Sequence, residues 1–164
     1  GVKNSKFLDN EIYNNGIREL TNFPDRGKRG GISIGHKDTD NIIAGNHIYE
    51  NAKYGFWFRT KTEANGAHRN IIRDNIIENN GLSAHVDRGW GIYISGISHD
   101  IQIENNIIRE TRNGNERLQK NAIQLQPGVT HVQMTENKIS GHPESAVIDN
   151  SKSPDNKLQI VSNP

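Results

Sequence analysis

The sequence contains no cysteine, which excludes disulfide frameworks and thiolate chemistry. Only 6% of its 164 residues are aromatic and 32% are hydrophobic, against roughly 45–50% apolar residues, glycine included, in globular domains. No apolar run approaches the roughly 20 residues of a membrane-spanning helix, so no membrane span is predicted. The 20 basic residues nearly balance the 19 acidic ones. This balance argues against a basic nucleic-acid-binding arm, and we expect no nucleic-acid partner.

Isoleucine and asparagine, with 22 copies each, dominate the sequence and recur in the pattern apolar-x-x-Asn-x-Ile. Complete copies lie at residues 7–12, 43–48, 72–77, 103–108 and 134–139, and a partial copy at 160–163. The intervals between the asparagines are 36, 29, 31, 31 and 26 residues. Repeats of about 20–50 residues with variable insertions indicate a solenoid.

A second motif, Gly-apolar-x-apolar, follows each asparagine at residues 31–34, 55–58 and 91–94, with looser copies at 122–125 and 145–148. Its period of two predicts short strands, and helical spacing is nowhere sustained. Asn-Gly pairs at 15–16, 65–66, 80–81 and 113–114 predict turns. Each coil should therefore hold two or three strands.

The repeated asparagines are expected to have a structural role. Stacked coils would bring them together at a bend, where their side chains hydrogen-bond along the solenoid axis. Because asparagine tolerates left-handed backbone, we expect these residues to adopt it. The set comprises Asn10, Asn46, Asn75, Asn106 and Asn137.

The Asn-x-Ile-x-x-Asn phrases and the Gly-Ile-Tyr-Ile-Ser-Gly phrase at 91–96 resemble right-handed parallel β-helix proteins of the pectate-lyase-like superfamily, with NosD-like and alginate-epimerase-like repeats. The resemblance implies one all-β, right-handed parallel β-helix domain over residues 1–164, with about five to six coils. Solenoid ends need caps. We therefore expect the chain to be part of a longer one, its ends capped by a missing segment or by another chain.

Insertions of different length follow the asparagine bend. Residues 16–30, 81–90 and 113–121 are inserted in three coils, whereas residues 51–55 make a short connection in another. All three insertions should leave the same corner of the solenoid. Insertions on one face of a repeat protein often form its binding face, so the short coil would be the floor of a cleft.

The strand beside that corner should expose every second residue. With the isoleucines and phenylalanines inward, Trp57 and Tyr93 become neighbours on the outer surface, where their rings would suit stacking against sugars. The alternative is that the inserted loops bury both rings. The expected outward rows are Ser33, Trp57, Tyr93, Gln124 and Val147, and then Gly35, Arg59, Ser95, Gln126 and Asp149.

The insertion at 81–90 brings catalytic residue types close to Tyr93. For elimination or epimerisation of a uronate, we expect Arg59 or Arg88 to neutralise the carboxylate, His85 to remove the C5 proton, and Tyr93 to donate a proton. The alternative is that residues 85–88 form only a solvated loop.

Further residues are candidates for substrate contact. An alternative places Trp90 under its own loop, and another pairs Arg112 and Arg117 with Glu110 and Glu116 to hold the insertion at 113–121. The candidate binding residues are Trp57, Trp90, Asp87, Arg112, Arg117 and Gln124.

No cofactor is predicted. Four histidines, His36, His68, His99 and His131, recur about once per coil, but their offsets from the asparagine bend differ. We therefore expect no metal site from them. Calcium remains an alternative, held by carboxylates among Asp38, Asp40, Asp74 and Asp100, although no ligand loop is recognisable.

Members of the resembled fold have many activities, so fold alone does not decide function. We expect a carbohydrate-active protein, secreted or on a bacterial cell surface, that acts on an acidic polysaccharide as a lyase or epimerase. One alternative is a noncatalytic binding, surface or tailspike module. Another is a glycoside hydrolase, which needs two carboxylates flanking one sugar; only Asp87 with Glu116 or Asp149 would suit.

Overall fold

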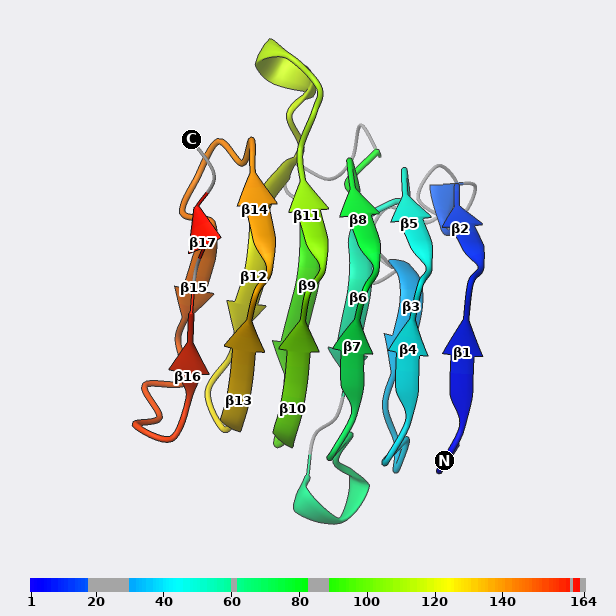
Figure 1. Cartoon of the computed structure of the whole chain (residues 1–164), viewed down its shortest axis with the longest axis vertical. Coiled ribbons are helices and arrows are strands. Elements are labelled where there is room, and N and C mark those ends of the chain that lie inside the picture. The colour runs from blue at the N-terminus through cyan, green and yellow to red at the C-terminus, as the bar shows by residue number, and fades with distance from the viewer. Residues whose placement is uncertain (18–29, 60–61, 83–88, 160, 163–164) are drawn as a thin grey trace.

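The protein is a solenoid of short parallel strands, seen in a computed structural model that describes residues 1–17, 30–59, 62–82, 89–159 and 161–162. Three sheets run along its length, and each coil adds one strand to each sheet. Two sheets form the front of Figure 1, one in its lower half and the other in its upper half, and the third lies behind them. No helix among the described residues is long and apolar enough to cross a membrane. The predicted all-β parallel β-helix is confirmed, with six strands in two sheets and five in the third.

Every strand pairing is parallel. The first sheet contains β1 (Lys6–Leu8), β4 (Ile42–Ala44), β7 (Ile71–Arg73), β10 (His99–Glu104), β13 (Thr130–Thr135) and β16 (Lys157–Leu158). The second contains β2 (Glu11–Tyr13), β5 (His47–Tyr49), β8 (Ile76–Glu78), β11 (Ile107–Arg109), β14 (Lys138–Ser140) and β17 (Val161–Ser162). The third contains β3 (Gly30–Ile34), β6 (Tyr54–Arg59), β9 (Gly89–Ser95), β12 (Gln119–Leu125) and β15 (Val147–Asp149).

The interior is a set of columns in which equivalent side chains of successive coils stack. Each fully buried isoleucine stabilises the fold by about 1.5–3 kcal/mol, so a thin core becomes adequate by repetition. The columns are Ile43, Ile72, Ile103 and Met134 in the first sheet, Ile48, Ile77, Ile108 and Ile139 in the second, and Phe56, Ile92 and Ile123 in the third.

The predicted asparagine ladder is present at the bend between the first and second sheets. The Asn75 side-chain oxygen accepts hydrogen bonds from the backbone N–H and the side-chain amide of Asn46, both at 2.9 Å. Asn75 in turn donates from both groups to the Asn106 oxygen at 3.0 Å. Asn10 begins the ladder and Asn137 accepts from Asn106 in the same manner.

The expectation that the ladder asparagines adopt left-handed backbone is wrong. The residue before each of them has the positive φ, as in Asp74 (58°), Asn105 (49°) and Glu136 (57°). The bend is made one residue earlier. The asparagine then turns its amide inward, where it satisfies backbone groups of two coils.

Two further ladders were not predicted. At the corner between the second and third sheets, Asn51 donates to Asn80, and Asn80 donates to Gln119. At the third corner Asn41 donates to Asn70. Polar ladders thus occur at all three corners of the coil.

A column of small residues lies where the third sheet begins. A Cβ on Gly91 would lie 2.6 Å from the Ala122 carbonyl oxygen and 2.7 Å from Cγ2 of Ile108. Gly31 and Gly55 are equally crowded by the next coil and by a core isoleucine. The glycine of the second motif is therefore required by close packing inside this corner.

Candidate functional site

The predicted insertions share one corner. Residues 14–29, 79–88 and 110–118 each join a second-sheet strand to a third-sheet strand, as the strand order requires. Residues 18–29 and 83–88 lie outside the described residues. The described insertion carries the short 3₁₀ helix η3 (Gly114–Glu116), which projects at the top of Figure 1.

Another insertion lies at the opposite end of the third sheet. Residues 60–70 join β6 to β7 and contain the 3₁₀ helix η2 (Glu63–Asn65), at the bottom of Figure 1. Its signal was present in the sequence. Ile72 lies 14 positions after Phe58, whereas the equivalent core residues in the adjoining coils are nine positions apart, for example Ile94 and Ile103.

The outward row of the third sheet is largely as predicted. Ser33 pairs with Trp57, Trp57 with Tyr93, and Tyr93 with Gln124. In the last coil the prediction is wrong by one residue. Ile148, not Val147, pairs with Gln124, because Val147 packs against the core.

Asp149 is displaced from the predicted second row by the same error in register. It pairs with the core residue Leu125. Its carboxylate accepts hydrogen bonds from the backbone N–H of Ser151 at 2.9 Å and from the Asn156 side chain at 3.3 Å. Asp149 therefore organises the turn that follows β15.

Four aromatic side chains form a contiguous cluster on the third sheet. Tyr54 lies at its centre, with its ring centroid 5.7 Å from that of Trp57, 5.2 Å from that of Trp90 and 5.3 Å from that of Tyr93. Trp90 and Tyr93 meet edge to face at 5.2 Å. The three predicted aromatic residues, Trp57, Trp90 and Tyr93, thus belong to one cluster with Tyr54, which was not predicted.

Polar and cationic groups border the aromatic cluster. The Lys53 ammonium lies 5.4 Å from the Tyr54 ring centroid and 5.3 Å from that of Trp90, and the Arg59 guanidinium lies 6.0 Å from that of Trp57. These distances are within cation–π range. The Trp90 indole N–H donates to the side-chain oxygen of Gln124 at 2.5 Å.

The rings are neither fully exposed nor fully covered by the described residues. Trp57, Trp90 and Tyr93 are half-buried, and Tyr54 is buried at 6% exposure. Burial raises the pKa values of Tyr54 and Tyr93. A tyrosine of ordinary pKa is already a neutral phenol at physiological pH, and burial makes Tyr93 hold its proton more firmly, so it can donate a hydrogen bond.

Two of the four predicted catalytic residues are described. Tyr93 and Arg59 lie on adjacent strands, where Arg59 pairs with Ser95, two residues beyond Tyr93. Their side chains occupy diagonal positions on one sheet face, which long side chains can span. His85 and Arg88, like Asp87, lie outside the described residues.

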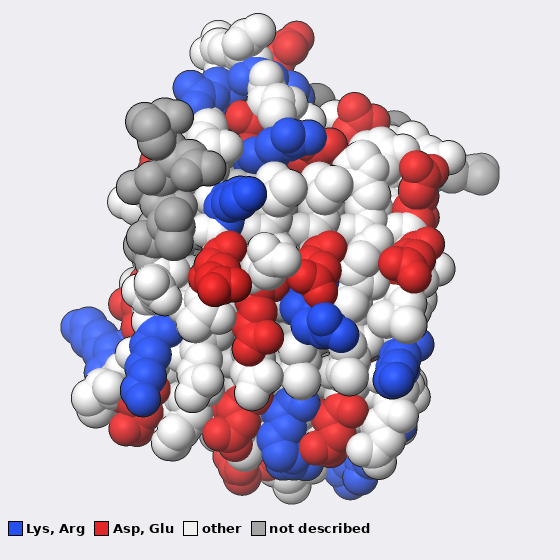
Figure 2. Space-filling view, in the orientation of Figure 1, with Lys and Arg blue, Asp and Glu red and all other residues white. Residues whose placement is uncertain are grey.

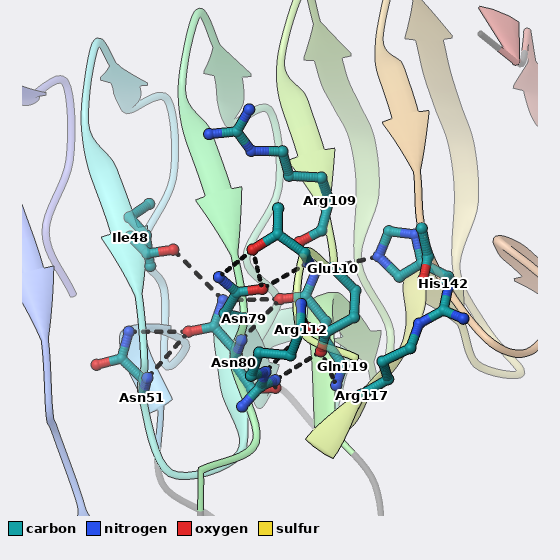
Figure 3. Close-up of polar contacts among 12 residues, drawn as sticks. Ile48, Asn51, Asn79, Asn80, Arg109, Glu110, Arg112, Arg117, Gln119 and His142 are labelled. Atoms are coloured by element: carbon teal, nitrogen blue, oxygen red, sulfur yellow. Dashed lines mark hydrogen bonds and ion pairs between the residues drawn. The ribbon is translucent and has the colours of Figure 1, made fainter. Parts of the chain in front are cut away.

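Arg112 is engaged within its own loop, as in the alternative considered for it (Figure 3). Its guanidinium donates to both Glu110 oxygens, at 2.9 and 2.6 Å, and to the Asn80 carbonyl at 3.2 Å. The Glu110 side chain is fully buried. Burial opposes its ionisation, but hydrogen bonds from Arg112 and Gln119 outweigh burial and lower the pKa of Glu110. This ion pair anchors the end of the Asn51 ladder.

Arg117 and His142 extend this cluster into the next coil (Figure 3). Arg117 donates to the Gly141 carbonyl. The Gln119 amide donates to Nε2 of His142 at 3.0 Å, so the proton of the neutral ring is on Nδ1. Burial lowers the pKa of His142 to about 4. Most polar groups of the cluster face one another, whereas the buried Nδ1 of His142 has no partner among the described residues.

Glu63, His68 and His99 gather near η2, with ligand atoms within 4.8 Å of one another. Nδ1 of His68 accepts the His99 backbone N–H at 3.2 Å, so Nε2 carries the proton, which it donates to the Glu63 carbonyl at 2.9 Å. A metal-bound histidine instead donates its second ring N–H and keeps the other nitrogen free for the metal. A metal ion on Nδ1 of His68 would displace the His99 N–H, although Nε2 could still donate to the Glu63 carbonyl; in the described structure both ring nitrogens are occupied by hydrogen bonds. The other two histidines of the predicted series, His36 and His131, are absent from the group.

The aspartates considered for calcium have protein partners. Asp38 accepts hydrogen bonds from the backbone N–H groups of Val2 and Gly35. Asp40 pairs with Arg69 at 2.6 Å, and hydrogen bonds from Arg69 lower the pKa of Asp40 to about 2. Two others complete the set: Asp74 contacts Arg73 and Asn105, and Asp100 contacts His99.

Among the described residues, the opposite side of the solenoid, formed by the first and second sheets, has no extended patch of a single charge. Figure 2 shows acidic and basic side chains interspersed over the first and second sheets. Several form pairs, such as Glu78, which bridges Arg109 and His47 at 2.5 and 2.8 Å. Its pKa is lowered by these two partners against the effect of burial. This face also has stacked rings, Tyr13 on Tyr49 at 5.0 Å and Tyr49 on His47 at 4.3 Å, so the third sheet differs in the size of its cluster and in its two bordering cations.

The stacked parallel sheets and their asparagine ladders define a parallel β-helix protein. A family model described as "Right handed beta helix region" matches residues 62–163, more than half of the chain. The chain belongs to this family, which agrees with the predicted handedness. No curated protein and no solved structure matches the chain significantly.

Proposed function

We propose that the protein binds an acidic polysaccharide on the outer face of the third sheet. The observation that carries the proposal is the aromatic cluster of Tyr54, Trp57, Trp90 and Tyr93, bordered by Lys53 and Arg59. Aromatic rings pack against the apolar C–H faces of sugars. Cationic side chains attract carboxylates, and a guanidinium can bind one in bidentate fashion.

The position of the cluster supports this use. It lies between the corner of the three insertions and the corner of η2, and loops on a rigid scaffold commonly supply binding residues. A polysaccharide could contact several rungs at once because the outward row continues from Trp57 through Tyr93 to Gln124.

The binding test compares pectate, alginate and a glycosaminoglycan with a neutral glucan, by titration calorimetry with and without calcium. We expect binding to an acidic polymer that weakens as salt is raised. Arg59→Gln should weaken it about tenfold, equivalent to about 1.4 kcal/mol. Arg73→Gln, at an exposed arginine of the first sheet, is the matched control. Equal affinity for neutral and acidic polymers, or equal effects of the two variants, would contradict the proposal.

An activity on the bound polymer would use Tyr93, a neutral phenol that lies diagonally from Arg59 on the same sheet face. In a β-elimination, His85 would remove the C5 proton and the C4–O bond would break. Tyr93 would protonate the leaving oxygen, and a C4–C5 double bond would form. Arg59 or Arg88 would neutralise the carboxylate. In an epimerisation the proton would return to the other face of C5 and no bond to the next sugar would break.

Ultraviolet absorbance of the unsaturated uronate tests the elimination. An increase that is lost in both Tyr93→Phe and His85→Ala would support it. The epimerase alternative predicts solvent deuterium at C5 without chain cleavage. Binding without either signal would identify a noncatalytic module.

A further inference from the structure

The four Asn-Gly pairs differ in a way that bears on chemical modification. In such a pair the glycine backbone nitrogen can attack the asparagine side-chain carbonyl, because glycine has no Cβ to hinder the approach. The reaction needs an exposed side chain and a glycine N–H without a hydrogen bond. Asparagine is a thermolabile residue for this reason.

Three of the pairs are held by hydrogen bonds. Asn80 is completely buried in its ladder, and the N–H of Gly81 donates to the Asn51 carbonyl at 2.7 Å. Asn15 is exposed, but its side chain and its backbone N–H both donate to the Asn51 side-chain oxygen, at 2.9 and 3.1 Å. Asn65 donates to Thr62 at 3.1 Å, and the N–H of the buried Gly66 that follows it donates to the Glu63 carbonyl.

The fourth pair is different. Asn113 and Gly114 are both exposed, and the Asn113 side chain makes no capping hydrogen bond to η3. Neither this side chain nor the N–H of Gly114 has a hydrogen-bond partner among the residues that the structure describes. No heavy atom lies within 4 Å of the position that a Cβ on Gly114 would occupy. The carbonyl groups of Asn113 and Gly114 accept backbone hydrogen bonds from Glu116 and Arg117, but the two groups that would form the ring have no partner among the described residues.

We propose that Asn113 is a site of spontaneous deamidation in the folded protein. The Gly114 nitrogen forms a bond to Cγ of Asn113, the bond from Cγ to the amide nitrogen breaks, and ammonia leaves. Water then opens the succinimide at either carbonyl. The products are aspartate, or isoaspartate with the main chain routed through the side chain. Each adds one negative charge, and no oxidant or reductant is needed.

The new charge falls on the loop at the corner of the third sheet. Asn113 follows Arg112, whose guanidinium is committed to Glu110, and Arg117 is committed to the Gly141 carbonyl. The added carboxylate would oppose an acidic polymer on the adjoining face. This consequence, unlike the modification itself, rests on the proposed function.

The experiment incubates the full chain at mildly alkaline pH and follows each Asn-Gly pair by peptide mapping and mass spectrometry. In the folded protein we expect Asn113 to react at least about tenfold faster than Asn15, Asn65 or Asn80, because only the latter are held. In urea the four rates should converge. Asn113→Gln should remove the early charge variant from ion-exchange profiles.

Reaction of Asn15 or Asn65 as fast as Asn113 in the folded protein would overturn the proposal. So would an Asn113 rate no higher than that of Asn80. The separated charge variant is then titrated with pectate, alginate and the glycosaminoglycan. Unchanged affinity for a polymer that the unmodified chain does bind would refute only the consequence for binding, and absence of binding to all three by the unmodified chain would refute only the proposed function.

Discussion

Removing one side chain from the asparagine ladder should destabilise the whole protein. Asn75 is 1% exposed and makes hydrogen bonds in both directions along the axis. Its oxygen accepts from the backbone and side chain of Asn46, and its amide donates to the Ile43 carbonyl and the Asn106 oxygen, all at 2.9–3.0 Å. In Asn75→Ala the backbone N–H of Asn46 and the Ile43 carbonyl lose these partners inside the solenoid.

A buried group left without a partner costs about 1–3 kcal/mol. Two such groups, together with the small cavity, predict a loss of about 3–5 kcal/mol for Asn75→Ala. Asn75→Asp should cost at least as much. Its second oxygen would face the Ile43 carbonyl and the Asn106 oxygen, and a buried charge would be introduced.

Urea unfolding, followed by tryptophan fluorescence and circular dichroism, measures these free energies by linear extrapolation. Asn115→Ala, at an exposed position of η3, is the control and should stay within about 0.5 kcal/mol of the parent protein. A loss below about 1 kcal/mol for Asn75→Ala would show that water replaces the missing partners. An Asn75→Asp variant as stable as the parent would show that the ladder is not buried as described.

Three other changes are expected to have measurable effects on unfolding. The pKa of His142 is about 4 in the folded protein and 6.5 ordinarily, so the unfolded chain binds the extra proton between these values. The contribution of neutral His142 to the free energy of unfolding should be fully present above pH 6.5 and should fall by up to about 3 kcal/mol as pH decreases to 4. Urea titrations at several pH values measure this slope, and His142→Gln should remove it. An unchanged slope would show that other groups cause it. Gly91→Ala should cost about 1–3 kcal/mol in the same assay, because its Cβ would meet the next coil at 2.6 Å, and a neutral effect would mean that the coils separate easily. Arg112→Gln should cost about 3–5 kcal/mol by leaving the Glu110 carboxylate buried and unpaired, whereas the double variant with Glu110→Gln should recover part of the loss; no recovery would mean that packing, and not charge, is responsible.

The architecture was predictable from the sequence because each coil repeats the same physical requirement. One isoleucine pattern occurs five times, so a wrong register in one coil would conflict with its neighbours. The prediction failed where that redundancy ends. In the last coil, Ser145-Ala146-Val147-Ile148 lacks the glycine that marks the corner, and both Val147 and Ile148 are suitable core residues. Only the pairing of Val147 with Ile123 decides between them.

The left-handed positions were misassigned for a related reason. The residue before each ladder asparagine varies among aspartate, glycine, asparagine and glutamate, so composition does not mark it. What repeats at the bend is the left-handed backbone conformation, which several residue types adopt. The asparagine that follows repeats because its side chain makes the hydrogen bonds of the ladder. A residue type can repeat because of what its side chain contacts, even when another residue carries the bend.

Three of the four aromatic residues of the cluster were predicted, and Tyr54 was missed because the alternation of the third sheet is interrupted. A Cβ on Gly91 would point to Ile108 in the core, and the following Ile92 is also buried there, so two successive residues face inward. Under strict alternation, Trp90 would face the core because it lies two positions before the buried Ile92. The Trp90 ring instead contacts that of the outward Tyr93. The same interruption brings Tyr54 to the outer side beside Trp57. The glycine at this corner shifts the alternation of inward and outward residues by one position. This shift puts Tyr54 and Trp90 on the same side as Trp57 and Tyr93, so the candidate binding face depends on it.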